Sequence, residues 1–246
     1  HSDIIKQKSL KRLVEVFQPH LCKKASIITT TSPNLLKFSK VLKKFENKVS
    51  ILPLGINLNP IDEKLSKGEY ILCLGRLSYY KGIDVLLQAY LKAKTRKELF
   101  IVGDGDKDIV ELITKYQNKS TRKIKFINQF VSEEEKRNLL KKCLFFVFPS
   151  IAASEAFGII QLEAMSYGKP VINTNLPTGV PFVSLDNVTG ITVEPSNIIE
   201  LAQAIDKLSF NNQLVDLMGE NAKKRVISHF SNVKIMTKLL RIYDSL

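Results

Sequence analysis

The sequence is poor in the residues that hold metals and disulfides. Its 246 residues include only three cysteines, which lie far apart among apolar neighbours and form no C-x-x-C pair: Cys22, Cys73 and Cys143. Buried free thiols are the simplest interpretation, and they suit a reducing cytosol. The three histidines, His1, His20 and His229, lack the spacing of a metal site. The composition therefore predicts neither a disulfide framework nor a metal centre.

Long apolar runs are also missing. No stretch reaches the roughly 18 residues that a membrane span needs, and no segment combines the basic start and apolar middle of a signal peptide. Because the chain begins at His1 rather than at Met, we expect a fragment or a processed form of a longer protein. With 44% apolar and 25% charged residues, it has the composition of an ordinary globular protein. We expect a cytoplasmic location.

Positive charge is concentrated at the two ends of the chain. The net charge is +13, and residues 1–50 carry 11 Lys/Arg against 3 Asp/Glu, whereas residues 221–246 carry 6 against 1. Residues 51–220 hold 20 of each sign and are neutral. The ends could form a solvated basic face, meet an anionic membrane surface or bind nucleic acid. Interleaved aromatics and nucleic-acid motifs are lacking, so we expect no nucleic-acid partner.

The apolar pattern after residue 69 predicts strands that alternate with helices. Strands are expected at 70–77, 98–105, 123–128, 144–150, 170–174 and 190–195. Helices are expected at 82–94, 106–119, 132–143, 157–168, 196–208, 211–229 and 231–245. Ser132 followed by Glu135 predicts a capping box. The alternation indicates a parallel sheet covered by helices on both faces, and such sheets bind ligands beyond the carboxyl ends of their strands.

The first 69 residues form a less regular region. A helix is expected over 4–17, a strand over 26–33, a helix that includes 34–45 and begins at Ser32-Pro33, and a strand over 49–57. The polar stretch 57–69 is typical of a linker or a domain boundary.

Cations follow the first regular strand in the sequence "GRLSYYKG". Gly75 and Arg76 come directly after this strand, and Lys81 stands at the start of the next helix. A guanidinium fork and an ammonium group at such a turn suit a diphosphate, although two surface cations in a loop would give the same pattern. Gly103 and Gly105 in "VGDG" follow the second strand, where they allow either close approach of a ligand or merely a tight turn.

Two glutamates frame the helix that follows the fourth strand. Glu155 precedes the helix start at Phe157-Gly158, and Glu163 lies within the helix. The free N–H groups at a helix start favour an anion, and a carboxylate can accept two hydroxyl hydrogen bonds from a ribose or a sugar ring. The alternative is that Glu155 only complements the helix dipole and that Glu163 is an ordinary solvated residue.

Together these pieces resemble glycosyltransferase family 4, retaining sugar-nucleotide enzymes of the GT-B fold. The matching segments are "LGRLSYYKGIDVLLQAY", "LFIVGDG", "FPSIAASEAFGIIQLEAMSYGKPVINTN" and "GVPFVSLDNVTGITVEP", and the glutamates match the E-x7-E motif of the family. The "LPTGVPFVS" segment resembles bacterial mannosyltransferases of surface-polysaccharide synthesis. The resemblance implies that 70–230 is the Rossmann-like donor domain and 1–56 the end of an N-terminal Rossmann-like domain. The segment 57–69 would link them, and 231–246 would be a helix that crosses back.

The resemblance also implies roles for individual residues. Arg76 and Lys81 would neutralise the donor diphosphate, Glu155 would hold hydroxyls of the transferred sugar, and Glu163 would hold the ribose. His1 falls where the family places a histidine that faces the sugar. The remaining donor contacts would come from four segments, which comprise Gly75, Gly103, Gly105, Phe130, Val131, Phe157, Gly158 and Ile159.

The implied reaction moves a hexose from a sugar nucleotide to a glycan or lipid-linked acceptor, without a divalent metal. GDP-mannose is the first donor to expect and a UDP-sugar the second. Most of the family's N-terminal domain is absent from the 246 residues, so we expect this chain alone to be inactive. Both basic ends would lie on one side, where we expect peripheral contact with the inner face of an anionic membrane. The alternatives are another GT-B enzyme, such as a phosphorylase, epimerase or hydrolase, or a non-catalytic anion-binding protein.

Overall fold

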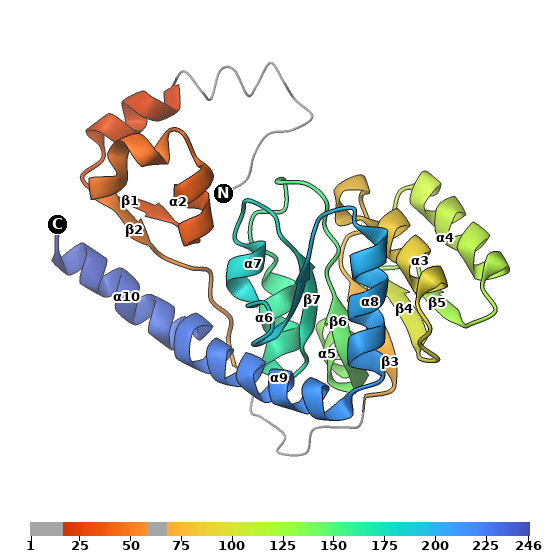
Figure 1. Ribbon diagram of the computed structural model, residues 1–246. Helices are drawn as coiled ribbons and strands as arrows, with labels where there is room; N and C mark the ends of the chain where they lie inside the picture. Colours follow the sequence, from red (N-terminus) through yellow and green to blue (C-terminus); the bar gives the residue numbers. More distant parts are fainter. Residues whose placement is uncertain (1–16, 59–67) are drawn as a thin grey trace.

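A six-stranded parallel sheet forms the centre of the molecule (Figure 1). The structure, a computed structural model, describes residues 17–58 and 68–246. The strand order is β5-β4-β3-β6-β7-β8, so the chain starts in the middle, runs to one edge and returns to build the other half. The order therefore reverses between β3 and β6, and a crevice forms at such a point in doubly wound sheets. The strands are Tyr70–Leu74 (β3), Glu98–Val102 (β4), Ile124–Ile127 (β5), Cys143–Val147 (β6), Val171–Thr174 (β7) and Gly190–Val193 (β8).

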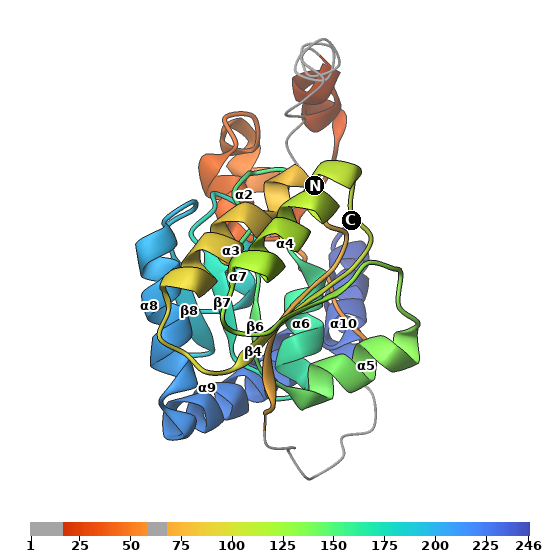
Figure 2. The same cartoon turned by 90° about the vertical axis from the view of Figure 1, so that its right-hand side faces the viewer.

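Helices cover both faces of the sheet, as the alternating pattern predicts (Figures 1 and 2). All residues of β3 and β6 are buried, because each face packs against its own apolar cluster. On β3, Ile71 and Cys73 belong to one cluster, while Tyr70, Leu72 and Leu74 belong to the other. The first cluster packs α3 (Ile83–Lys92), α4 (Lys107–Lys119) and α8 (Ile198–Ser209), the second α5 (Glu133–Lys142) and α6 (Ile159–Ser166), and α9 (Asn212–Arg225) contributes to both.

The helix start at Ser132 has the predicted capping box. The Ser132 hydroxyl accepts the Glu135 backbone N–H, and the Glu135 carboxylate accepts the Ser132 N–H at 2.8 Å. A short helix that the sequence pattern did not predict, α7 (Val180–Val183), follows β7. A single 3-10 turn, η2 (Tyr79–Lys81), precedes α3.

The N-terminal unit holds two parallel strands, β1 (Ile28–Thr30) and β2 (Val49–Ile51). Both are shorter than expected. Between them, α2 (Pro33–Phe38) starts at the predicted Ser32 cap, but the expectation of a single helix through residue 45 is wrong. Ser39 adopts an extended backbone, and its hydroxyl accepts the Leu42 N–H to start the 3-10 helix η1 (Leu42–Lys48). Serine competes for backbone hydrogen bonds in this way, which is why it favours helix ends.

Two crossings join this unit to the sheet, and they run side by side. The chain leaves β2 past Ile56 and returns through the short π-helix η3 (Val226–Phe230) into α10 (Asn232–Asp244). The Ile56 N–H donates to the Phe230 carbonyl at 2.9 Å, and the Asn232 N–H donates to the Ile56 carbonyl at 3.0 Å. Helix α10 then lies beside β1 and β2 (Figure 1), where its residues line a groove of about 620 Å³ together with Ile27 and Ser50. The two basic ends of the described chain therefore lie on one side.

Candidate active site

The loops that follow β3 and β4 are packed together through glycine. Gly75 and Gly103 both have a φ of 142°, which favours glycine. A Cβ atom on Gly103 would lie 1.9 Å from the Gly75 carbonyl oxygen, so the close approach excludes any other residue there. At Gly75, by contrast, a Cβ atom would have no described neighbour within 4 Å. Gly75 therefore borders open space at the carboxyl edge of the sheet.

The loops that follow β3 and β6 also pack closely against each other, at the point where the strand order reverses. Gly82 has a φ of 65°, and a Cβ atom there would lie 2.2 Å from the Pro149 carbonyl oxygen. The Ile151 N–H donates to the Tyr80 carbonyl at 2.8 Å. These contacts place the start of α3 directly against the segment that leads to Glu155.

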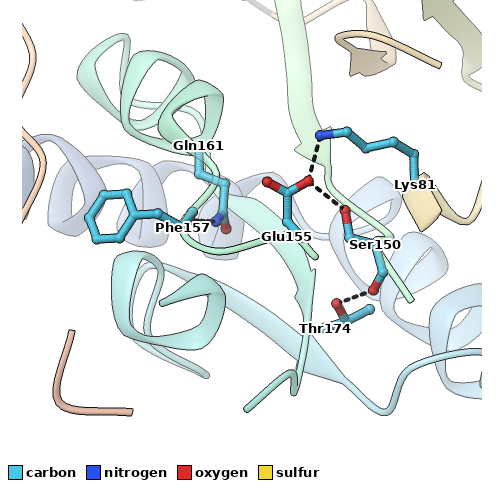
Figure 3. A network of polar contacts seen from close by, with 6 residues as sticks. All are labelled: Lys81, Ser150, Glu155, Phe157, Gln161 and Thr174. Atoms are coloured by element: carbon cyan, nitrogen blue, oxygen red, sulfur yellow. Dashed lines mark hydrogen bonds and ion pairs between the residues drawn. The ribbon is translucent and has the colours of Figure 1, made fainter. Parts of the chain in front are cut away.

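Lys81 and Glu155 form an ion pair at this junction (Figure 3). The Lys81 Nζ lies 2.5 Å from Glu155 Oε2, and the two side chains are only 17% and 12% exposed. The Ser150 hydroxyl donates to the same oxygen at 3.3 Å, while the Ser150 carbonyl accepts the Thr174 hydroxyl at 2.6 Å. No described residue donates to Glu155 Oε1, so this oxygen can accept a hydrogen bond from a ligand.

The pairing changes how positive charge is distributed at the site. Because Glu155 compensates the charge of Lys81, the ammonium group is already partnered before any diphosphate arrives. Arg76 is exposed and forms no ion pair with the residues that the structure describes. The guanidinium of Arg76 is therefore the more accessible group for a phosphate.

The start of α6 supplies a second anion-attracting group beside the ion pair. Gly158 caps the helix with a φ of 77°, and no side chain caps it. Within the described chain, the N–H groups of Ile159 and Ile160 have no acceptor. Free N–H groups and the helix dipole together favour a phosphate at such a position. Phe157 and Gly158 are buried, whereas Ile159 is 42% exposed, so the turn reaches the surface at Ile159.

A buried polar network that the sequence reasoning missed supports this turn. Gln161 is fully buried, its amide donates to the Phe157 carbonyl at 3.1 Å (Figure 3), and its oxygen accepts from Asn173 at 3.0 Å. Asn173, also fully buried, donates to the Val180 carbonyl and accepts the Thr192 hydroxyl at 2.7 Å. The network ties α6, β7, α7 and β8 together. The available signal was a polar residue inside each apolar run, "GIIQLEAM" and "PVINT".

Glu163 pairs with a lysine that the sequence reasoning did not single out. Lys136 Nζ on α5 lies 2.8 Å from Glu163 Oε2 and 2.9 Å from Glu133 Oε2. Burial works to lower the pKa of Lys136, but the hydrogen bonds to Glu163 and Glu133 raise it overall. Lysine at position 136 is thus held between two carboxylates.

The other expected donor contacts lie at the carboxyl ends of β4 and β5. The Gly105 N–H reaches the Asn128 side-chain oxygen at 3.4 Å, which connects the two loops. Phe130 is 87% exposed, whereas Val131 packs against the apolar cluster beneath it. His1, the remaining candidate, lies outside the described residues.

Comparison with known proteins decides the class of the chain. Residues 58–225 match the family model "Glycosyl transferases group 1". The chain belongs to this family. The expected resemblance to a glycosyltransferase family is thereby confirmed, and the site just described lies within the matched region.

Two curated relatives of the chain are informative. The chain is 29% identical to an O-antigen chain mannosyltransferase C of Escherichia coli over 100% of this chain and 68% of that protein. It is 32% identical to the D-rhamnosyltransferase WbpZ of Pseudomonas aeruginosa over 92% of this chain and 61% of that protein. The chain thus spans about two thirds of the length of these relatives.

The fold is shared with a solved structure. Anabaena Alr3699/HepE, crystallised with UDP and glucose, superposes with a TM-score of 0.80 at 20% identity, over 98% of this chain and 68% of that one. This likeness confirms the expected GT-B type α/β fold.

Other kinds of chemistry find little support in the described residues. Burial raises the pKa of the Cys73 and Cys143 thiols to about 12, so neither is a ready nucleophile. No group of three or more His, Cys, Asp or Glu side chains that could hold a metal ion occurs in 17–58 or 68–246. Over the same ranges, every helix is too short or too polar to cross a bilayer.

Proposed function

We propose that the chain is the donor-binding part of a retaining glycosyltransferase. The enzyme moves a hexose from a sugar nucleotide to a glycan or lipid-linked acceptor in surface-polysaccharide synthesis. The observation that carries the proposal is the Lys81–Glu155 pair beside the free start of α6, at the point where the strand order reverses in a group 1 glycosyl transferase domain. The names of the two curated relatives support the reaction, and the O-antigen in the first name supports the setting.

The site suits the charge changes of sugar transfer. Breaking the bond between sugar and phosphate leaves negative charge on the departing nucleotide diphosphate. Arg76 and the start of α6 would oppose this charge where it develops, and fixed groups of this kind stabilise a transition state without reorganising. Lys81 would divide its hydrogen bonds between Glu155 and the diphosphate. Glu155 Oε1 would accept a hydrogen bond from a hydroxyl of the sugar, and Glu163 would accept hydrogen bonds from the ribose hydroxyls. His1 would face the sugar.

The donor is proposed to carry a sugar of the manno configuration. One relative is named a mannosyltransferase and the other a D-rhamnosyltransferase, and D-rhamnose is 6-deoxymannose, so both sugars share the same ring stereochemistry. GDP-mannose is therefore the first donor to test and a UDP-sugar the second. A thermal-shift panel of sugar nucleotides on the full-length protein would rank them, and a UDP-sugar that stabilises more than every GDP-sugar would overturn this order.

A product assay tests the reaction. The full-length protein is incubated with GDP-mannose or a UDP-sugar, with and without a glycan acceptor. A glycosyltransferase releases nucleoside diphosphate mainly when the acceptor is present and forms a product that retains the anomeric configuration. Nucleotide release at the same rate with and without the acceptor would indicate a hydrolase. An isomerised donor would indicate an epimerase, and formation of a sugar phosphate would indicate a phosphorylase. The 246-residue chain by itself should bind the donor weakly and transfer nothing, and equal rates for both proteins would contradict this expectation.

The reaction is also proposed to need no divalent metal, because the two cations and the helix start would neutralise the diphosphate in its place. Asp104 and Asp106 flank Gly105 near this position and are exposed, so the proposal needs a direct test. Transfer rates should be equal in EDTA and in excess Mg²⁺ or Mn²⁺. A rate that falls in EDTA and recovers with metal would overturn metal independence alone.

We further propose that the side of the molecule formed by the basic ends contacts an anionic membrane, where a lipid-linked acceptor would be presented. Helix α10 has an exposed apolar stripe formed by Val233, Met236, Leu240 and Tyr243. Lys234, Lys238 and Arg241 lie beside this stripe and line the groove toward β2. A basic face next to an apolar stripe is the pattern of helices that lie in a membrane interface.

Vesicle flotation tests the membrane contact. The full-length protein should float with vesicles that contain anionic lipid and not with neutral ones at low salt. Replacing Lys234 and Lys238 by Gln should reduce flotation, whereas Lys123→Gln, on the amino side of β5, is the matched control. Equal recovery with both kinds of vesicle would reject the proposal.

A further inference from the structure

Lys136 links helix α5 to helix α6 beside the candidate active site. Its side chain is 18% exposed, and its ammonium group lies between two carboxylates, Glu133 on its own helix and Glu163 on α6. Glu133 is 73% exposed, so the inner partner is the better-buried Glu163, at 24%. Two acids and one cation leave a net negative charge at this position.

The ion pair fixes how the Glu163 carboxylate is turned. Lys136 occupies Oε2 at 2.8 Å, and no described residue donates to Oε1. A glutamate side chain otherwise rotates about several bonds, and holding it costs conformational entropy whenever it binds a ligand. Because Lys136 already holds one oxygen, the other is kept available in one orientation for a hydroxyl pair.

We propose that Lys136 is a positioning residue for the donor, acting through Glu163 on the ribose of the sugar nucleotide. The inference rests on the proposed function and deepens it, since it assigns a role to a residue on α5 that touches no donor atom itself. Glu133 holds Lys136 from the solvent side, so its removal should produce a weaker version of the same effect.

The expected signature is a change in donor binding with little change in turnover. In the full-length protein, Lys136→Met should raise the donor KM and the Kd of GDP or UDP by about 10-fold, which corresponds to the loss of one well-oriented hydrogen bond, and should leave kcat within about 2-fold. Lys136→Arg, which can still reach both carboxylates, should restore much of the affinity. Glu133→Gln should have a smaller effect.

Lys123→Met is the matched control. Lys123 pairs with Glu98 at 3.2 Å, and its side chain is 66% exposed. The pair lies at the amino ends of β4 and β5, at the opposite end of the strands from the candidate site. The same substitution there removes an ion pair without reaching the donor, so KM and kcat should both stay unchanged.

Two further measurements separate positioning from a structural role. Adding Lys136→Met to Glu163→Gln should cause no further loss, because the intermediary is already gone. With 2′,3′-dideoxy forms of GDP or UDP, wild type and Lys136→Met should bind equally, because the hydroxyls that Glu163 would hold are absent.

The inference is overturned if Lys136→Met behaves like Lys123→Met. It is equally overturned if Lys136→Met weakens binding of the dideoxy nucleotide as much as binding of the normal nucleotide. Full additivity between the losses of donor affinity caused by Lys136→Met and by Glu163→Gln would also overturn it. If the wild-type protein itself binds neither GDP nor UDP, the proposed function fails and this inference fails with it. Wild-type binding and transfer with an unaffected Lys136→Met variant would remove the inference alone.

Discussion

Two lysine–carboxylate pairs lie at opposite ends of the strands of the same sheet, and they differ in burial and in their supporting hydrogen bonds. Lys81 and Glu155 meet beyond the carboxyl ends of β3 and β6, with side chains 17% and 12% exposed. Lys123 and Glu98 meet at the amino ends of β5 and β4, with side chains 66% and 39% exposed. Ser150 donates to the Glu155 carboxylate of the first pair, while among the described residues only Lys123 contacts the Glu98 carboxylate of the second.

The two pairs differ in what they contribute to the protein. An exposed pair contributes little to stability because water screens it and side-chain entropy opposes it. A pair shielded from water interacts more strongly and costs more to assemble. The shielded pair lies where doubly wound sheets bind ligands, which makes location and burial, rather than the presence of an ion pair, the informative features.

The largest expected effect separates the two carboxylates. Glu155→Gln should lower kcat/KM for transfer by about 100-fold or more, because it removes a charged hydrogen-bond acceptor and leaves Lys81 without its partner. Glu98→Gln should leave kcat/KM within about 2-fold of the wild-type value, because Glu98 lies at the amino ends of the strands, away from the candidate site. Steady-state transfer assays on both full-length variants check the comparison, and similar rates for the two variants would break it.

Arg76 should come next in effect. Arg76→Met is expected to lower kcat/KM by about 10- to 100-fold, as for the loss of one charge-assisted bond to a phosphate. The free energy of unfolding should not change, because Arg76 is exposed and forms no ion pair with any described residue. Rates and thermal melts together test this, and an Arg76→Met variant with normal affinity for GDP and UDP would show that Arg76 does not contact the diphosphate.

Gln161 should show a stability effect that neither ion pair can match. Gln161→Leu removes the hydrogen bond that Asn173 donates to Gln161 and leaves the Phe157 carbonyl without its side-chain donor in a buried site, at a cost of roughly 1–3 kcal/mol in the free energy of unfolding. Gln161→Glu should also destabilise, because it buries a charge. Denaturant titration measures both, and a Gln161→Leu variant as stable as wild type would mean that the network contributes no net stability.

The smallest expected effect belongs to the exposed pair. Lys123→Met should change the free energy of unfolding by no more than about 0.5 kcal/mol, and added salt should reduce even this difference. Denaturant titration at low and high salt measures it. A decrease in the free energy of unfolding of more than about 1.5 kcal/mol would show that exposure does not predict how much an ion pair stabilises this protein.

Sequence patterns predicted the parts of the molecule that depend on local chemistry. The alternation of apolar runs after residue 69 predicted the parallel sheet, and Ser132 with Glu135 predicted a capping box whose two hydrogen bonds are formed. The same kind of reasoning failed at Ser39, where the hydroxyl starts a second helical segment instead of continuing the first. It also missed α7, a single turn within a segment rich in turn-forming residues.

Partners between distant residues could not be predicted from local patterns. The sequence indicated Lys81, Glu155 and Glu163 as site residues, but their partners depend on how β3, β6, α5 and α6 come together. Lys81 is 74 positions from Glu155, and Lys136 reaches Glu163 only because α5 lies against α6. The Gln161–Asn173 bond likewise joins a helix to the next strand across the core. Such pairs depend on topology, which periodicity alone does not specify.

The most direct test of the central claim is a crystal structure of the full-length protein with GDP-mannose or the best-binding sugar nucleotide. The diphosphate should lie within hydrogen-bond distance of Arg76 and of the N–H groups of Ile159 and Ile160. A hydroxyl of the sugar should bind Glu155. The donor could instead bind elsewhere, leaving the Lys81–Glu155 ion pair unchanged and without any contact to the donor. That result would contradict the proposal that this is the donor site.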